Sequence, residues 1–127
     1  MGLVDLNHFS ITVAPDAIEG TEKFYTDVLG LRVGDRPAFT FPGRWLYCGE
    51  TAVVHLIGTG EPGAAPPDTG RLDHIAFRAT GLAAMRERIE KSGVEFRERD
   101  VPGGRLRQLF VRDPNGILIE LNFSANE

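Results

Sequence analysis

The chain has 127 residues, enough for one domain with a full hydrophobic core and too few for two independent domains. Its residues are 42% hydrophobic and 25% charged, and its formal net charge is −4, which excludes the basic face of a nucleic-acid-binding protein. It contains no apolar run long enough to span a membrane and no secretory signal pattern at its start.

The first predicted element is a strand within residues 3–13. Apolar and polar residues alternate there after Leu6, which is the two-residue period of a half-buried strand. The apolar side contains Phe9, Ile11 and Val13, and the polar side contains His8, Ser10 and Thr12.

A helix is predicted to begin after this strand, at Pro15. Asp16 is expected to cap its first turn, and Glu19, three residues later, would complete a start resembling a capping box. The buried face of this helix is expected to contain Ile18, Tyr25, Val28 and Leu29, and Gly30 should end it. Three strands follow, over residues 31–33, 45–49 and 52–58.

Residues 59–70, TGEPGAAPPDTG, form a linker rich in glycine and proline. The same order of elements returns after it. A strand is predicted over 72–79, a helix with the buried stripe Leu82, Met85 and Ile89 follows, and three strands cover 94–97, 106–112 and 117–123. The turn signal DPNG (113–116) separates the last two strands. We therefore expect one domain with a first module (1–58), a linker (59–70) and a second module (71–127).

The two modules correspond in detail. LNHFSIT (6–12) aligns with LDHIAFR (72–78), and AVVHLI (52–57) corresponds to GILIEL (116–121) with a shift of one residue between them. His8 thereby matches His74 at an offset of 66 residues, and His55 matches Glu120 at an offset of 65. This repeat predicts an α+β fold of tandem βαβββ modules whose strands form a cupped mixed sheet.

Four polar residues at these equivalent strand positions predict a metal site: His8, His55, His74 and Glu120. Their apolar neighbours have the opposite parity and should face the helices, which leaves the polar side chains inside the cup. Glu120 stands between Ile119 and Leu121, where an ionised carboxylate is costly to bury unless a cation or donor receives it. Imidazole and carboxylate ligands suit a divalent Zn, Ni, Co, Mn or Fe ion.

Each of these histidines taken alone is more often an ordinary hydrogen-bonded residue, so the prediction depends on the set of four. The chain has three histidines, and all three occupy repeat-equivalent positions. His55 is the weakest member of the set, because it could also act as a base or support the other ligands.

Several further residues are candidates for substrate binding. Four arginines could pair with a carboxylate, a phosphate or a thiol conjugate: Arg44, Arg78, Arg105 and Arg107. Arg78 is favoured because it has the strand parity of His74; the alternative is that all four are solvated charges at strand edges. Trp45 and Tyr47 share a strand face and would form an apolar wall or part of the core. Asp113 is expected to organise its turn.

The single cysteine, Cys48, cannot form a disulfide within the chain. This agrees with a reducing compartment, so we expect a cytoplasmic protein. Cys48 lies in an apolar, strand-like run, which predicts an inert buried thiol more than a nucleophile.

The chain resembles the vicinal oxygen chelate superfamily, which includes glyoxalase I, fosfomycin-resistance proteins, bleomycin-binding proteins, methylmalonyl-CoA epimerase and extradiol dioxygenases. The resemblance covers nearly the whole chain and rests on NHFSITV (7–13), FYTDVLGLRV (24–33), AVVHLIG (52–58), DHIAFR (73–78) and DPNGILIEL (113–121). It implies that His8, His74 and Glu120 bind the metal. The position of His55 holds Glu in glyoxalase I and Gln in the epimerase, so His55 is a departure.

A closer likeness is to the glyoxalase-I-like proteins of bacteria and plants. It rests on FPGRWLY (41–47), VHLI (54–57) and RQLFVRDPNG (107–116), and it implies that Gln108 contacts a substrate. Thr12 stands where glyoxalase I carries an arginine for glutathione, and Phe110 stands where the dioxygenases carry a tyrosine. Bleomycin-binding members generally lack the metal ligands, so the intact set here argues against drug sequestration alone.

The resemblance implies a metal-dependent lyase or isomerase of the glyoxalase type, or a related transferase, acting on a small substrate that chelates through oxygen. Glu120 or His55 would move the proton. Two alternatives stay open: an Fe(II) ring-cleaving dioxygenase using two histidines and one carboxylate, and an antibiotic-binding resistance protein. The family also implies a homodimer, with the site built within one chain or shared between two.

Overall fold

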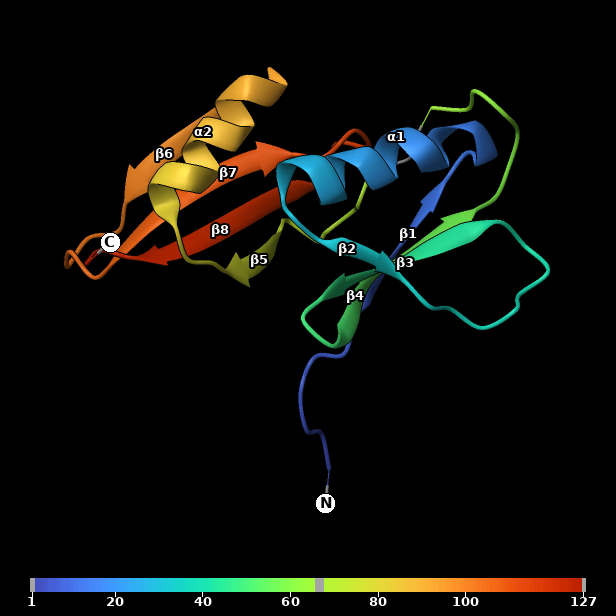
Figure 1. Cartoon of the computed structure of the whole chain (residues 1–127), viewed down its shortest axis with the longest axis horizontal. Helices are drawn as coiled ribbons and strands as arrows, with labels where there is room; N and C mark the ends of the chain where they lie inside the picture. The colour runs from blue at the N-terminus through green and yellow to red at the C-terminus, as the bar shows by residue number, and fades with distance from the viewer. Residues whose placement is uncertain (1, 66–67, 127) are drawn as a thin grey trace. The chain divides into compact units, whose positions relative to one another are not determined.

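The computed structural model describes residues 2–65 and 68–126 (Figure 1). The chain divides into two compact units, Met1–Pro66 and Pro67–Glu127, and each has its own sheet. The division falls inside residues 59–70, where the sequence predicts a linker. In the described residues, no helix has both the length and the apolar character needed to cross a lipid bilayer.

The first unit contains a four-stranded mixed sheet with the strand order β1-β4-β3-β2. Strands β1 and β4 are parallel, and the other neighbouring pairs are antiparallel. In chain order its elements are β1 (Phe9–Val13), η1 (Pro15–Ala17), α1 (Ile18–Lys23), η2 (Phe24–Val28), β2 (Arg32–Gly34), β3 (Gly43–Cys48) and β4 (Thr51–Gly58).

The second unit repeats this arrangement with the order β5-β8-β7-β6, and here β5 and β8 are the parallel pair. Its elements are β5 (Ile75–Arg78), α2 (Leu82–Ser92), β6 (Phe96–Asp100), β7 (Leu106–Arg112) and β8 (Leu118–Ser124). The two units therefore have the same strand order and the same strand senses. This confirms the predicted α+β fold of two βαβββ modules.

The repeat extends to the pairing of single residues in the two sheets. Ser10 pairs with His55 between β1 and β4, and Ala76 pairs with Glu120 between β5 and β8. Ser10 and Ala76 are themselves equivalent in the two aligned segments. His55 and Glu120 thus hold the same place in their respective sheets, as the alignment of the halves predicts.

Alternation along the strands separates a buried face from an open face in each unit. On β1, Ile11 and Val13 are buried while Ser10 and Thr12 are exposed. On β8 the buried side chains are Ile119, Leu121 and Phe123, which alternate with the more accessible Leu118, Glu120, Asn122 and Ser124. Figure 1 shows α2 lying along the sheet of the second unit, and Leu82 and Ile89 of this helix are buried.

The strands that carry the first histidine of each pair start later than predicted. Pairing between β1 and β4 begins at Phe9, and pairing between β5 and β8 begins at Ile75. His8 and His74 each lie one residue before the strand. A residue is part of a strand only where a neighbour pairs with its backbone, and alternation alone does not mark that limit.

Strand β6 also differs, covering Phe96–Asp100 instead of residues 94–97. Its last residues are charged, and the strand is at the edge of its sheet, where charged side chains stay in solvent. Asp100 pairs with Arg107 of β7, so tertiary pairing extends this strand beyond its apolar part.

The start of the first helix departs from the prediction. No side chain caps the first turn of η1 or α1, so the predicted capping role of Asp16 is wrong. Pro15 opens η1, where its missing N–H costs nothing. The Oδ1 atom of Asp16 instead accepts a hydrogen bond of 2.9 Å from the backbone N–H of Gly63, which ties the 59–65 segment to the helix start.

The prediction that Cys48 is buried is also wrong, because its side chain is exposed. The pairing of β3 with β4 shifts by one residue between Leu46 and Tyr47, and Cys48 follows at the end of the strand, beside the turn at Gly49. A bulge bends the strand and changes which side chains face the core. Leu46, just before the shift, is fully buried.

Candidate metal centre

In the first unit, His8 and His55 lie against each other. Their rings are stacked with centroids 3.7 Å apart and an angle of 12° between the planes. The parallel pairing of β1 with β4 explains this contact, because Ser10 is opposite His55 and His8 has the parity of Ser10. Both imidazoles therefore project from the same face of the first sheet.

Hydrogen bonds set which ring nitrogen of each histidine stays available. The Nδ1 atom of His8 donates to the amide oxygen of Asn7 at 2.7 Å, which leaves Nε2 as its ligand atom. The Nε2 atom of His55 donates to the backbone carbonyl of Ala52 at 3.0 Å, which leaves Nδ1 with its lone pair. Both rings are thus held in a tautomer able to bind a cation.

The pKa of His55 is lowered below its ordinary value of 6.5. Partial burial is the largest cause and the neighbouring His8 is the second; the hydrogen bond to Ala52 acts in the opposite direction. His55 is consequently neutral at neutral pH. A neutral imidazole is the form that binds a metal ion or accepts a proton.

In the second unit, His74 and Glu120 form the equivalent pair. The Nε2 atom of His74 lies 3.5 Å from Oε1 of Glu120. The Nδ1 atom of His74 donates to the carboxylate of Asp73 at 2.8 Å, so Nε2 is the nitrogen directed at Glu120. A carboxylate behind a histidine is the usual arrangement that orients a metal-binding ring.

Asn7 and Asp73 orient two of the candidate ligands, and neither was predicted from the sequence. Each immediately precedes a histidine, and the two are equivalent in the repeat. Each accepts a hydrogen bond from Nδ1 of its neighbour. The recurrence of Asn-His and Asp-His at matching places was the signal that could have identified them.

Glu120 is held by a row of polar side chains across the second sheet, here called the Glu120 network: Arg99, Gln108, Asn122 and Glu120. Asn122 Nδ2 donates to Glu120 Oε2 at 2.8 Å, and Gln108 Nε2 donates to Asn122 Oδ1 at 2.9 Å. Arg99 donates twice to Gln108 Oε1, at 3.0 and 2.7 Å. The carboxylate of Glu120, 13% exposed, therefore has a fixed orientation without a direct cationic partner in this row.

The predicted substrate residue Gln108 is buried in this network, with 7% of its surface exposed. Both ends of its amide are occupied, by Arg99 on one side and by Asn122 on the other. Gln108 reaches Glu120 through Asn122. Asn122 and Arg99, like the network itself, were absent from the sequence prediction, because nothing in their spacing marks them.

Trp45 lies beside the first pair. Its ring stacks on His55 with centroids 4.1 Å apart, so His8, His55 and Trp45 form a continuous stack. Trp45 and His55 also line a small cleft of about 330 Å³ together with Asn7 and Tyr47. Tyr47 donates its hydroxyl to the backbone carbonyl of Asp35.

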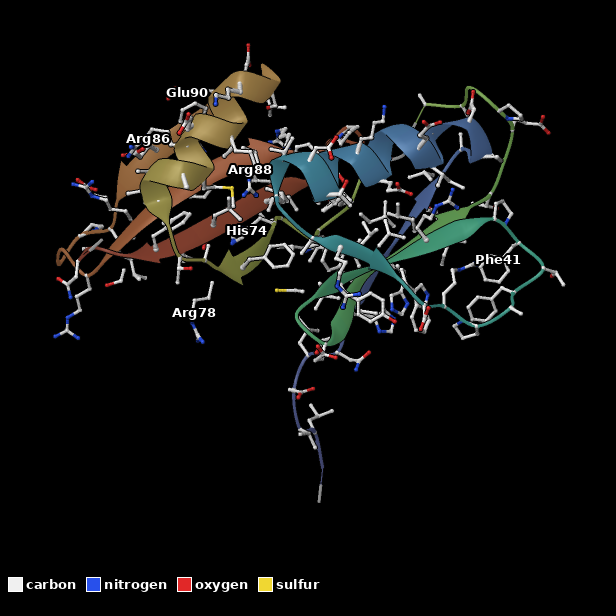
Figure 2. The ribbon with its side chains drawn as sticks, in the orientation of Figure 1. Phe41, His74, Arg78, Arg86, Arg88 and Glu90 are labelled. Carbon is white, nitrogen blue, oxygen red and sulfur yellow. The ribbon has the colours of Figure 1, made fainter. Side chains whose placement is uncertain are left out.

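The four candidate arginines have different surroundings. Arg44 pairs with Glu22 at 2.8 Å, and Arg107 pairs with Asp100 at 3.1 Å. Arg78 and Arg105 line a second cleft, of about 600 Å³, in the second unit. Figure 2 shows Arg78 projecting from β5 on the side away from α2.

Asp113 has the structural role expected of it. Its Oδ1 atom accepts hydrogen bonds from the backbone N–H groups of Asn115 and Ile117, at 2.8 and 2.9 Å. These bonds close the turn between β7 and β8, and Asp113 is 4% exposed.

Each unit brings together one pair of candidate ligands. Within the parts of each unit that the structure describes, no group of three or more His, Cys, Asp and Glu side chains forms a site for a metal ion. The two pairs together offer three imidazoles and one carboxylate, a donor set that suits a divalent transition metal.

The chain matches a family model over residues 5–121, nearly its whole length. The model describes the glyoxalase/bleomycin resistance protein/dioxygenase superfamily. This chain belongs to that superfamily.

Two curated relatives share substantial identity with this member of the superfamily. A protein named glyoxylase I 4, from Arabidopsis thaliana, is 30% identical over 94% of this chain and 70% of its own length. A lactoylglutathione lyase from Salmonella typhimurium is 36% identical over 77% of this chain and 78% of its own length.

Two solved structures have the same fold as this chain. A glyoxylase/bleomycin resistance protein/dioxygenase domain from Frankia sp. EAN1pec aligns with a TM-score of 0.79 at 22% identity, covering 97% of this chain and 93% of that one. A mutant form of the fosfomycin resistance protein FosX from Listeria monocytogenes aligns with a TM-score of 0.74 at 18% identity, covering 97% and 94%. At these identities the likeness establishes the fold.

Proposed function

We propose that this chain is a metal-dependent enzyme of the glyoxalase I type, a lyase or isomerase or a related transferase. Its substrate is a small molecule that chelates through oxygen atoms. Membership of the superfamily and the names of the two curated relatives support this proposal. The local observation that carries it is the matching hydrogen bonding of His8 and His74 within their own units, where each Nδ1 atom donates to the side chain of the preceding residue.

The proposed ligands of one divalent ion are His8, His55, His74 and Glu120. The three histidines support this assignment because hydrogen bonds fix the orientations of their rings. Glu120 supports it because its Oε1 atom lies 3.5 Å from His74 Nε2. Asn7 and Asp73 would hold the histidines behind the ion. The ion itself, when bound, supplies Lewis acidity at an oxygen of the substrate.

The proposed proton carrier is Glu120. Its carboxylate lies on the accessible face of β8 and accepts a hydrogen bond from Asn122 through Oε2. Oε1, which lies 3.5 Å from His74 Nε2, would take a proton from a carbon next to the substrate oxygen and return it, and this role requires that Glu120 is not a ligand while substrate is bound. His55 is the second candidate, because its lowered pKa keeps it neutral and its Nδ1 lone pair is available.

Trp45 and Arg78 are the proposed substrate contacts, since each lines a cleft. Gln108 supports the site from within the sheet in this proposal, because it donates to Asn122. Arg107 pairs with Asp100 and lies opposite Phe123 of the buried face, so it is not given a role at the site. We further propose a homodimer, in which the two ligand pairs of one centre come from the same chain or from two chains.

A second candidate function is resistance to a small antibiotic. It is favoured by the FosX structure, which was determined in complex with Mn(II) and 1S,2S-dihydroxypropylphosphonic acid. Turnover of fosfomycin, measured beside turnover of a hemithioacetal, separates this function from the glyoxalase type.

The metal content of the purified protein tests the lead proposal. We expect about one divalent ion per ligand set, and we expect Glu120→Gln to reduce metal affinity by tenfold or more and to abolish turnover, since it removes a charged ligand. Glu87→Gln is the matched control, because Glu87 is an exposed helix residue paired only with Lys91. Intact metal content and turnover in Glu120→Gln would refute the proposal.

A further inference from the structure

The cleft of about 600 Å³ in the second unit has a composition that the proposed metal and proton chemistry leaves unexplained. It is lined by Ala76, Phe77, Arg78, Ala79, Thr80, Arg105, Leu106, Asn122 and Ser124. Two lining residues are arginines, and none is Asp or Glu. The charged residues that line this cleft are therefore all cationic, although the chain as a whole has a net charge of −4.

Most of the cleft lies on the face of the sheet that bears Glu120. Arg78 is opposite Asn122, and Leu106 is opposite Ser124. Residues opposite each other point to the same side, and alternate residues of β8 share a face, so Glu120, Asn122 and Ser124 project together. Asn122 lines the cleft and also donates to Glu120, which makes the two regions continuous.

The two guanidinium groups in the cleft are unpartnered. In the described part of the chain, neither the Arg78 nor the Arg105 side chain makes a hydrogen bond or an ion pair, whereas Arg86 makes a two-fold contact with Glu98 at 2.8 and 3.0 Å. Each guanidinium offers donors in a rigid fork that matches the oxygens of a carboxylate, phosphate or phosphonate.

We propose that this cleft binds an oxyanion group of the substrate, held by Arg78 and Arg105. The inference rests on the proposed function for the role of Glu120 and adds the chemical class of the substrate. Arg78 is level with Asn122, two residues beyond Glu120, and this spacing is roughly 7 Å at about 3.3 Å per residue. The substrate is therefore a short anion, with its oxyanion only a few bonds from the oxygen next to the reacting carbon.

The proposal is tested by titrating the purified chain with methylphosphonate and with acetate while recording backbone amide shifts. We expect saturable shifts at residues 76–80 and 105–106. Arg78→Ala and Arg105→Ala should each weaken binding about tenfold or more, because each removes a charged hydrogen-bonding partner. Arg78→Lys should be intermediate, since it keeps the charge and loses the fork. The stronger ligand of the two identifies the class of oxyanion.

Two controls decide between this cleft and other ways of binding an anion. Arg88→Ala removes an exposed arginine of α2 that lies outside the cleft and is labelled in Figure 2. It should leave binding unchanged; an effect as large as that of Arg78→Ala would show attraction by general charge and overturn the proposal. The neutral dimethyl ester of methylphosphonate should not bind, and equal binding of this ester would also overturn it.

The Glu120→Gln variant separates failure of this inference from failure of the proposed function. Binding of methylphosphonate should persist in that variant, because the change removes a negative charge near the cleft. Binding lost in Glu120→Gln but retained in Arg78→Ala and Arg105→Ala would place the anion on the metal ion and refute the cleft. If the metal analysis refutes the proposed metal centre while methylphosphonate still binds, the proposal for the cleft is retained.

Discussion

At the residue scale, the most informative feature is the way short-range hydrogen bonds prepare the histidines. His8 and His74 are held through Nδ1 by the side chains that precede them, and His55 is held through Nε2 by a backbone carbonyl. A ring that is already oriented loses less conformational entropy when it binds a ligand. These contacts are local in sequence and arise within each unit separately.

The buried amide of Gln108 gives a stability prediction at this scale. Gln108→Leu leaves Asn122 Oδ1 without its donor and Arg99 without its acceptor, so we expect a loss of about 1–3 kcal/mol in the free energy of unfolding. Urea denaturation measures it. Ser124→Ala, at an exposed end of β8, is the control and should change stability by less than about 0.5 kcal/mol. Equal stabilities of the two variants would contradict a structural role for the amide.

At the scale of elements, β3 and β4 approach closely because Gly43 lacks a side chain. A Cβ atom at Gly43 would overlap the backbone carbonyl oxygen of Leu56 on β4, and backbone cannot move aside as a flexible side chain can. This position lies at the start of β3, two residues before Trp45, so the close pairing helps to set the strand that carries the stacked rings.

Two Gly→Ala substitutions, one at this contact and one away from it, test this packing. Gly43→Ala should destabilise the protein by about 1–3 kcal/mol, because the added methyl group forces the strands apart. Gly20→Ala, within α1 at a position where the new Cβ would meet no other part of the protein beyond its own turn of helix, should stabilise it by about 0.5–1 kcal/mol through helix propensity. Thermal denaturation of both variants shows whether each change lowers or raises the melting temperature. A Gly43→Ala variant as stable as the wild type would show that the strands can adjust.

At the scale of the whole molecule, the repeat divides the proposed centre into two ligand pairs. His8 and His55 belong to the first unit, and His74 and Glu120 belong to the second. Both pairs arise from the same register. In each unit the histidine just before the first strand lies near a residue within the last strand, with which the first strand pairs in parallel. A duplicated module thus supplies two pairs of candidate ligands of related but unequal composition.

Two double variants test whether both half-sites serve one ion. His8→Ala/His55→Ala and His74→Ala/Glu120→Gln should each lose the metal, because each keeps only one pair. Metal analysis of the separate variants checks this, and full metal content in either would contradict the shared centre. In a mixture of the two, recovery of about a quarter of the wild-type activity indicates pairs from different copies of the chain, since half of the dimers would carry one intact site. No recovery indicates a site within one chain.

The sequence alone determined the two-module α+β fold, the equivalence of His8 with His74 and of His55 with Glu120, and the superfamily. The fold and the equivalences depend on period-two alternation and on repeated segments, and the superfamily depends on the resemblance of short motifs; all are properties of the linear chain. Only the tertiary structure revealed where strands begin and end, why Cys48 is exposed, the row from Arg99 to Glu120, and the unpartnered arginines of the cleft. Those features arise from pairing between strands that are far apart in sequence. The partner of a side chain across a sheet depends on the register of the two strands, and the residues next to it in the sequence do not specify that register.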